Sequence, residues 1–475
     1  MRRMIAALAA VTIAAGLVAC RRDLPVRSIE AGTGPEAKIA RPLRLSVLPV
    51  VRREDPLRLV VDLVEQPDWA AIGAEIGSGS PTRAERKKRL WLRLVALEER
   101  RASFLEWLRM QPGVAGIRSF RCVNRVAFDG SEAVVRALVE RPDVRWIWGR
   151  LPDRQPVLAA ESPRGEVGEG STWAIDAIGA RAAWNEGVRG EGVVVAVMDS
   201  GVTGRHPALA GRRATPVHDE LAGKVDPGHG HGSAVLAAAV GEGIGIAPAA
   251  RWTAVDPLAA GYLDPELLAD SIDWLLETAR PDVVIAPWDA ADDGPPQLLA
   301  IPLAALRCAG MAVVFAAGNF GPAVGANHRP GNLAGLGPDD AAAFSVGGVS
   351  ATWEPYQFSC RGPSAEDGSL FPAISAPAVA LTIADEINGG TRVGHGTSYA
   401  AGYAGGALAL VLSTDPTMTG PQAERLLLST AHDLGDPGPD MVFGHGLIDV
   451  PAALRASGAR SGSAKARDAG QRQSR

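Results

Sequence analysis

The stretch VVVAVMDSG at residues 193–201 begins as an unbroken apolar run and ends in a carboxylate and a glycine. A short apolar run of this kind is typical of a parallel strand that is buried on both faces. Similar runs follow at 283–286, 311–317 and 344–349. Helix-like stretches lie between them, such as 265–278 and 297–308. The alternation predicts a doubly wound, mostly parallel α/β sheet with helices on both faces, over residues 171–455.

Four polar side chains lie at the ends of these predicted elements, where catalytic groups of α/β sheets gather. Asp199 ends the first strand, and Asn319 follows the third apolar run. His231 and Ser398 each open a helix rich in small or apolar residues. A serine at a helix N-terminus lies beside backbone N–H groups, which suits a nucleophile, and an asparagine amide suits a donor to an oxyanion.

Each position also has an ordinary structural interpretation. Asp199 suits a turn or helix cap, Ser398 suits an N-cap, and Asn319 suits a turn residue. A single histidine such as His231 is more often structural than catalytic. His229 and His231 are spaced at i and i+2, but no third ligand is placed near them, so we expect no metal there.

The four positions are more specific together than singly. The motifs DSG at 199–201, HGS at 231–233, GN at 318–319 and GTS at 396–398 occur in this order. This order resembles the subtilase family, whose triad runs Asp, His, Ser along the chain. Further similar motifs are GIAP at 245–248, FSCRGP at 358–363, ISAP at 374–377 and GHGLID at 444–449.

The resemblance implies a serine endopeptidase acting on protein or peptide substrates. Ser398 would attack the peptide carbonyl, His231 would transfer the proton, and Asp199 would orient the imidazole. Asn319 and the Ser398 backbone N–H would bind the oxyanion. Calcium is common in this family, but we can place no ligands for it in this sequence and therefore assign no cofactor.

The sequence departs from the family pattern after the apolar run 283–285. Where the family usually has Ser-Leu-Gly, whose backbone pairs with the substrate, this chain reads Ala286-Pro287-Trp288. Pro287 removes one N–H, and we expect Trp288 to add bulk to the wall of the substrate cleft. Gly402 replaces a proline of the family and should loosen the helix that follows Ser398. An inactive scaffold used for binding is therefore the alternative to an enzyme, and the retained set of four residues favours the enzyme.

Residues 57–150 have the pattern of a small α+β domain. Strands are expected at 57–63, 123–128 and 144–148, a long helix at 83–109, and a short helix at 131–140. This segment resembles the inhibitory propeptide of subtilases. The resemblance implies a folding template and temporary inhibitor in a self-processing precursor, cut between 150 and 171. Lys and Arg outnumber Asp and Glu in 21–164, whereas acidic residues dominate 166–454, so the two parts should attract each other.

Residues 1–20 have the pattern of a secretory signal, in which Arg2 and Arg3 precede an apolar run. The run ends in Leu17-Val-Ala-Cys20, which resembles a bacterial lipobox. Lipidation of Cys20 would anchor the exported chain to a membrane, and an ordinary cleavable signal is the alternative. Residues 21–56 are expected to be a linker and 456–475 a disordered tail. The net charge of −5 implies no nucleic-acid partner.

Overall fold

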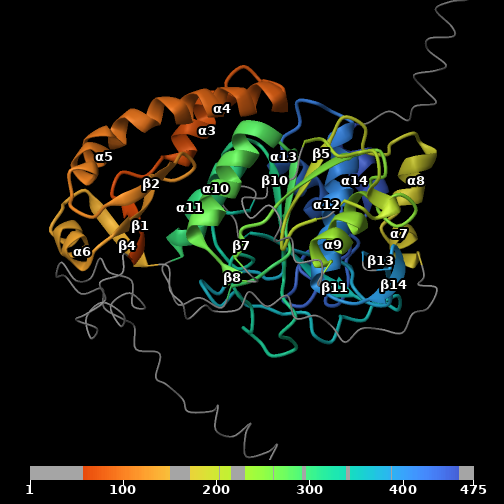
Figure 1. Cartoon of the computed structure of the whole chain (residues 1–475). Helices are drawn as coiled ribbons and strands as arrows, with labels where there is room; N and C mark the ends of the chain where they lie inside the picture. The colour runs from red at the N-terminus through yellow and green to blue at the C-terminus, as the bar shows by residue number, and fades with distance from the viewer. Residues whose placement is uncertain are drawn as a thin grey trace, which may run out of the picture.

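The computed structural model describes residues 57–149, 172–202, 204–215, 230–259, 262–290, 296–337, 343–386 and 388–458. The predicted signal, the linker at 21–56 and Cys20 lie outside the described residues, as do His229 and most of the predicted tail. The described chain forms two bodies side by side, the first red to orange and the second yellow to blue in Figure 1.

The first body contains an antiparallel sheet in the order β2-β3-β1-β4. Its elements are β1 (Leu57–Leu63), α3 (Trp69–Gly77), α4 (Arg83–Leu97), η2 (Glu98–Arg101), α5 (Ala102–Arg109), β2 (Ala115–Phe120), β3 (Arg125–Gly130), α6 (Glu132–Val139) and β4 (Val144–Gly149). The central strand β1 has both faces buried. Leu59, Val61 and Leu63 pack against α5 and α6, whereas Val60 faces a core shared with the second body.

The helix expected over 83–109 is interrupted. A 3-10 turn, η2, separates α4 from α5. The turn contains Arg101, which is buried and donates a hydrogen bond to the carbonyl of Phe120. We attribute the break to this side chain, because Glu98 to Arg101 offers no apolar residue to continue the buried stripe. Helix α3 and strand β2 were not expected from the sequence.

The second body is built on a six-stranded sheet in the order β12-β11-β10-β9-β5-β6, and its strand pairs are parallel. The strands are β5 (Val194–Met198), β6 (Arg251–Val255), β9 (Val283–Ala286), β10 (Ala312–Ala316), β11 (Phe344–Val349) and β12 (Ile374–Pro377). The sequence order along the sheet reverses beside β5, which is the signature of a doubly wound sheet.

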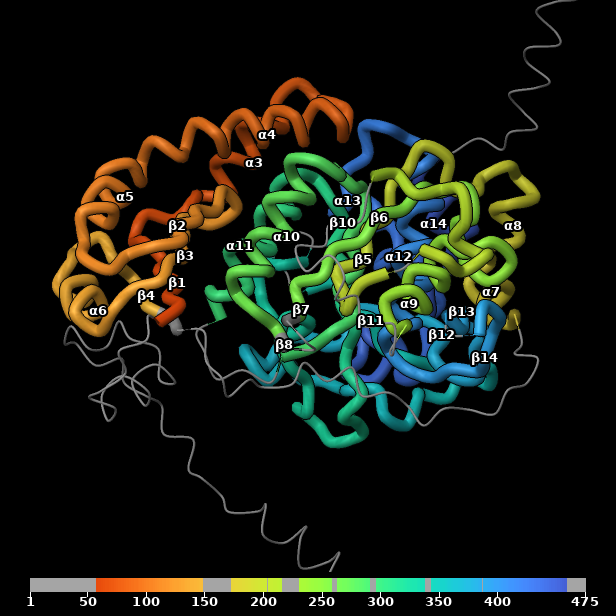
Figure 2. The backbone as a smooth tube through the Cα atoms, viewed as in Figure 1, coloured from red at the N-terminus to blue at the C-terminus, as the bar shows by residue number. Residues whose placement is uncertain are grey.

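Helices cover both faces of this sheet. Val195 and Val197 of β5 pack in one core with α9 (His231–Val240) and α12 (Thr397–Ser413). Ala196 and Met198 pack in a second core with α10 (Pro265–Trp274) and α11 (Gln297–Cys308). Successive side chains of a strand point to opposite faces, so the two helix pairs lie on opposite sides, as Figure 2 shows. The predicted fold class is confirmed.

Smaller elements complete the second body. They are α7 (Trp173–Ala177), α8 (Ala180–Asn185), η3 (Pro207–Leu209), β7 (Leu258–Ala259), β8 (Tyr262–Leu263), η4 (Leu275–Ala279), β13 (Leu381–Asp385), β14 (Gly390–Gly394), α13 (Gly420–Ser429) and α14 (Val450–Ala456). Cys122, Cys308 and Cys360 are buried and free of disulfides. Within the described residues, we find no helix that combines the length and the apolar character needed to cross a membrane.

Candidate active site

Asp199 follows the last residue of β5, so it lies at the carboxyl edge of the parallel sheet. Its backbone N–H donates to the carbonyl of Val255 at the end of β6 (3.1 Å), which extends the sheet ladder by one residue. The residue is 2% exposed. Oδ1 accepts hydrogen bonds from the backbone N–H (2.6 Å) and the hydroxyl (2.9 Å) of Ser200. These bonds fix the orientation of the carboxylate.

His231 is the first residue of α9, and its imidazole lies against this carboxylate. The distances from Nδ1 to Oδ2 and Oδ1 of Asp199 are 2.8 Å and 3.1 Å. Because a carboxylate can only accept, we assign the ring proton to Nδ1, which leaves the lone pair on Nε2. This is the tautomer that a general base requires.

The close approach of α9 to Asp199 depends on Gly232. A Cβ at this position would lie 2.5 Å from the carbonyl oxygen of Gly201 and 3.1 Å from Cβ of Asp199. Backbone atoms cannot move aside at such distances without moving the strand end. A glycine directly after His231 therefore lets the helix start seat its imidazole on the carboxylate.

Asp199 is held in its ionised form. Burial alone would raise its pKa, because the charged form loses solvation. The charge and hydrogen bond of His231, together with the two bonds from Ser200, outweigh burial and lower the pKa below its usual value. The carboxylate is thus available to stabilise a protonated imidazole.

Ser398 is the second residue of α12 and is 4% exposed. Its hydroxyl donates to the carbonyl of Pro287, at 3.2 Å. The ring of the next residue, Tyr399, lies 6.0 Å from the ring of His231 between centroids. The first turn of α12 therefore lies beside the imidazole, on the same edge of the sheet as Asp199.

The start of α12 is also tied to Asn319. Oδ1 of Asn319 accepts from the backbone N–H (3.0 Å) and the hydroxyl (3.1 Å) of Thr397. A backbone N–H is only a donor, so this contact identifies the amide oxygen and leaves Nδ2 as the donor at the other edge of the group. Thr397 also accepts from the N–H of Gly318, at 3.2 Å. The structure thus brings Asn319 next to Ser398, and Thr397 is a positioning residue that the sequence analysis missed.

The expectation for Trp288 was wrong. Its side chain is 2% exposed and packs in the core with α10 and α11, so it is not part of the cleft wall. Its indole N–H donates to the carbonyl of Met198, the residue before Asp199 (2.9 Å). The indole is large and apolar with one donor, and this buried position satisfies both properties. Pro287, by contrast, lies directly beside Ser398.

Gly402 lies within helix α12, which is continuous from Thr397 to Ser413. A Cβ on Gly402 would lie 2.7 Å from the carbonyl oxygen of Val235 and 3.0 Å from Cβ of Ala238, both in α9. The glycine therefore permits the two helices that carry His231 and Ser398 to pack closely.

A buried acid next to this site escaped the sequence analysis. Asp289 is 6% exposed, and its Oδ1 lies 3.6 Å from Nδ1 of His328. Its other oxygen lies 3.2 Å from the position of a Cβ on Gly318, the neighbour of Asn319. Burial raises the pKa of Asp289, and the contact with His328 only partly offsets that. Residues 289 and 328 are too distant in the sequence for any spacing to have paired them.

The described residues contain no group of three or more His, Cys, Asp or Glu side chains that could hold a metal ion. Residues 216–229, which include His229, are outside that search. No residue set is therefore assigned to calcium or to any other metal.

Comparison with known proteins gives one family. A sequence profile described as the subtilase family matches residues 190–446. Bacillopeptidase F of Bacillus subtilis (strain 168) is 28% identical over 412 residues, which cover 76% of this chain but only 28% of that protein. Subtilisin of Bacillus pumilus is 30% identical over 292 residues, covering 60% of this chain and 98% of that protein.

A solved structure is similar to both bodies. The crystal structure of fervidolysin from Fervidobacterium pennivorans, described as a keratinolytic enzyme related to subtilisin, aligns with a TM-score of 0.58. The alignment covers 86% of this chain and 62% of that chain, at 21% identity. At that identity the similarity concerns the fold alone.

Proposed function

This chain belongs to the subtilase family, and on that premise we propose that it is a serine endopeptidase with the triad Asp199, His231 and Ser398. The observation that carries the proposal is the pairing of His231 Nδ1 with the buried, ionised Asp199 at the sheet edge where α12 presents Ser398. The proposed substrates are proteins or peptides.

The reaction follows from the chemistry of these groups. In the proposed reaction, Ser398 Oγ exchanges its hydrogen bond to the Pro287 carbonyl for one to Nε2 of His231. Nε2 takes the hydroxyl proton as Oγ attacks the peptide carbonyl carbon, and the resulting imidazolium is stabilised by Asp199. His231 then returns the proton to the leaving amine, and water hydrolyses the acyl-enzyme by the same steps in reverse.

Charge on the carbonyl oxygen develops during the attack. We assign its stabilisation to Nδ2 of Asn319 and the backbone N–H of Ser398. The bonds from Thr397 to Oδ1 hold the Asn319 amide in place before the reaction starts, so no reorganisation is needed during it.

We further propose that the chain is made as a precursor. Residues 57–150 would act as its inhibitory propeptide, and the chain would cut itself between 150 and 171. Export would follow from the signal at 1–20, with lipidation of Cys20 as membrane anchor. Mass spectrometry of the N-terminal peptide tests the anchor, since an unmodified Cys20 contradicts it.

The deciding experiment compares the wild-type precursor with Ser398→Ala, using a fluorophosphonate probe that reacts with activated serines. We expect labelling and loss of about 150 N-terminal residues in the wild type only, because nucleophilic attack requires Oγ. A folded wild type that is neither labelled nor processed would support the binding-scaffold alternative instead.

A further inference from the structure

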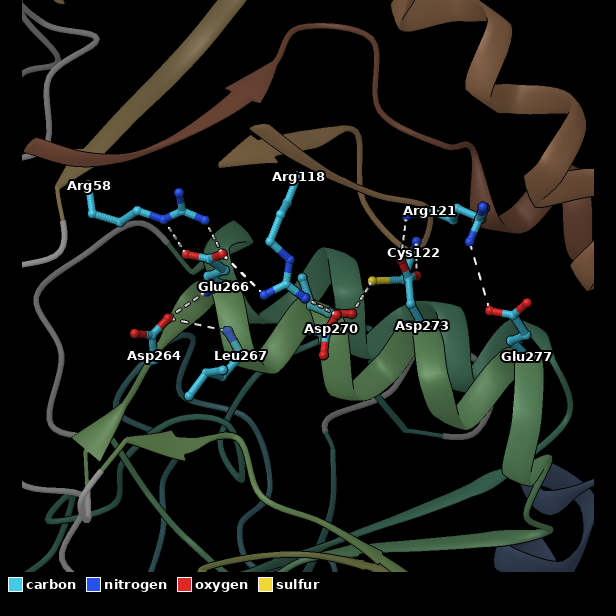
Figure 3. Close-up of polar contacts among 11 residues, drawn as sticks. Arg58, Arg118, Arg121, Cys122, Asp264, Glu266, Leu267, Asp270, Asp273 and Glu277 are labelled. Carbon is cyan, nitrogen blue, oxygen red and sulfur yellow. Dashed lines mark hydrogen bonds and ion pairs between the residues drawn. The ribbon is translucent and has the colours of Figure 1, made fainter. Parts of the chain in front are cut away.

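Buried carboxylates need partners, and the described part of the chain provides a hydrogen-bond donor for all of them but one. Figure 3 shows two that are bound by the first body: Glu266 accepts from Nε of Arg58 (2.9 Å), and Asp273 accepts from the N–H of Cys122 (2.7 Å). The other buried acids that accept hydrogen bonds are Asp62, Asp199, Asp264, Asp282, Asp385 and Glu424.

Asp289 is the exception. The residue is 6% exposed, and within the described ranges no hydrogen bond reaches its carboxylate. Its ion pair joins Oδ1 to Nδ1 of His328 at 3.6 Å, which is longer than a hydrogen bond, and that nitrogen has no hydrogen-bond partner among the same residues. A buried acid without a close partner is unfavourable to the fold, and beside a reaction centre such an acid is a candidate functional residue.

The carboxylate lies between the two segments that flank Ser398. Asp289 is two residues past Pro287, whose carbonyl accepts from the Ser398 hydroxyl at 3.2 Å. Its Oδ2 lies 3.2 Å from the position of a Cβ on Gly318, the residue before Asn319. These segments follow the neighbouring parallel strands β9 and β10. The acid is therefore placed where the proposed nucleophile and the proposed oxyanion donor meet.

The surroundings of the carboxylate suit a long side chain. Gly318 has a φ of +99°, and its lack of a side chain leaves the space between Asp289 and Cys360 free. Phe320 directly follows Asn319 and is partly exposed, and its ring meets that of His328 edge to face, with centroids 4.8 Å apart. Lysine and arginine lay their apolar stems along such surfaces and extend only the charged group beyond them.

The proposed attack fixes where a substrate would lie. Its carbonyl carbon would be bonded to Oγ of Ser398, and its carbonyl oxygen would lie at Nδ2 of Asn319. The residue that supplies this carbonyl would therefore have its side chain next to Asp289. A cationic side chain there supplies both things that the carboxylate lacks, which are an opposite charge and hydrogen-bond donors.

We propose that Asp289 is a specificity-determining residue, whose carboxylate binds the positive charge of an arginine or lysine whose carbonyl Ser398 attacks. The inference rests on the proposed peptidase function and adds a substrate class to it, namely chains cleaved after a basic residue. An acid that receives the substrate side chain sets specificity in this way in trypsin. His328, with its side chain 31% exposed, lies close enough to balance the carboxylate before substrate binds.

The proposed self-cleavage gives this specificity a consequence within the chain. The segment from 150 to 171 contains three basic residues, Arg150, Arg154 and Arg164. The first cut should follow one of them, so that the new N-terminus is at position 151, 155 or 165.

The first test uses the self-processed wild-type chain and fluorogenic peptides that differ only in the residue before the cleaved bond. That residue is arginine, lysine, norleucine, glutamine or glutamate. We expect kcat/KM for arginine and lysine to exceed that for norleucine by at least about 30-fold, because an uncharged chain leaves the buried carboxylate unpaired. A norleucine or glutamate value within about threefold of the arginine value overturns the proposal.

Asp289→Asn keeps the shape of the side chain and removes its charge. We expect the ratio of kcat/KM for the arginine peptide to that for the norleucine peptide to fall at least about tenfold. Structural damage to the site would lower both values alike and leave their ratio unchanged. Asp436→Asn, at an exposed position, is the matched control and should keep the wild-type ratio. Equal ratios in the two variants overturn the role of Asp289.

Self-cleavage gives a second readout, which needs no change in the site. Mass spectrometry of the first product of the full chain identifies its N-terminus, and a first cut after a residue other than arginine overturns the proposal. Replacing the three arginines by glutamine should slow processing by at least about tenfold, whereas replacing three acids of the same segment should not. The two triple variants are Arg150→Gln with Arg154→Gln and Arg164→Gln, and Glu161→Gln with Glu166→Gln and Glu169→Gln.

Fluorophosphonate labelling separates this inference from the proposed function. The probe carries no amino-acid side chain, so it reports the reactivity of Ser398 without the contribution of Asp289. A labelled wild type that hydrolyses all the peptides equally overturns only the role of Asp289. A wild type that is neither labelled nor able to hydrolyse any of the peptides overturns the peptidase, and the specificity with it.

Discussion

At the residue scale, the site is organised around contacts one residue away from the reacting groups. Thr397 binds Asn319, Gly232 lets His231 approach Asp199, and Trp288 bonds to the carbonyl before Asp199. None of these neighbours has a chemical role of its own. Their effect is positional, and small displacements of positioned groups are costly for catalysis.

The oxyanion assignment predicts the effect of Asn319→Ala. Loss of the Nδ2 donor should lower kcat by about 10²- to 10³-fold and change KM little, because the donor acts on charge that develops only in the transition state. A fluorogenic peptide assay measures both constants. Asn185→Ala, at an exposed position on α8, is the control. A fall in kcat of less than about threefold would remove Asn319 from the mechanism.

The buried position of Trp288 predicts that its substitution lowers the stability of the fold without changing substrate specificity. Trp288→Phe keeps most of the buried ring and leaves the carbonyl of Met198 without its donor, which should cost about 1–3 kcal/mol of unfolding free energy. Urea titration of the Ser398→Ala precursor measures that loss. Relative kcat/KM values across a peptide panel should stay constant in the active form. A change in the order of the kcat/KM values among the peptides would show that Trp288 does line the substrate cleft.

At the scale of elements, the active site is a product of helix packing. His231 and Ser398 open two helices, α9 and α12, whose backbones pack closely through Gly402. Both helices are buried along nearly their whole length on one face of the sheet. The separation of the proposed base from the proposed nucleophile is therefore set by the packing of these two helices, and not by a loop.

Gly402→Ala tests this dependence. The added methyl meets the Val235 carbonyl at 2.7 Å, so the helices must separate, at a cost of about 1–3 kcal/mol for an overpacked core. We expect a lower kcat as well, since the separation moves Ser398 away from His231.

Gly73→Ala, in α3, is the matched control for that variant. Its new methyl would find contacts only at 3.6 Å and beyond, so helix propensity should dominate and stability should be kept or raised. Thermal unfolding and peptide hydrolysis are measured for both variants. Equal behaviour of the two would show that α9 and α12 tolerate separation.

At the scale of the whole molecule, the two bodies share one hydrophobic core. Residues of α3, α4 and β3 join α10 and α11 in it. The first body also has a core of its own, between its sheet and the helices α5 and α6. Its sheet is consequently buried on both faces, one of them only in the presence of the second body.

The contact of Asp273 with the first body predicts that the stability of the precursor depends on pH. Burial raises the pKa of Asp273 to about 6, although its carboxylate accepts two N–H groups. A carboxyl whose pKa is raised on folding contributes stability that is complete below its unfolded pKa and is lost as pH rises through 6. The precursor should therefore be less stable at pH 7.5 than at pH 5, with Asp273 accounting for about 1.4 kcal/mol of the difference.

Asp273→Asn isolates this contribution. The amide cannot ionise, so the difference in urea midpoint between pH 5 and pH 7.5 should shrink relative to the parent chain. Both chains carry Ser398→Ala to prevent self-cleavage. Asp367→Asn, at an exposed position, should leave the difference unchanged. An unaltered pH dependence in Asp273→Asn would mean that other carboxyls, such as the buried Glu424, cause it.

The sequence by itself predicted the sheet and the residues that we propose as the reacting groups. Buried parallel strands need unbroken apolar runs such as 193–198, and that requirement is local. The motifs around Asp199, His231, Asn319 and Ser398 are local as well, and their order along the chain identified the family. Local patterns also gave most of the first body, except α3, β2 and the break at Arg101.

Only the tertiary structure decided how distant residues meet. Trp288 is bulky and follows a strand, which fits a cleft wall and a core equally well, and its partner Met198 is ninety residues away. The pairings of Arg83 with Asp282 and of Asp289 with His328 likewise join segments with no shared spacing. Burial and pairing depend on which surfaces the fold brings together, and a pattern confined to neighbouring residues carries no information about that.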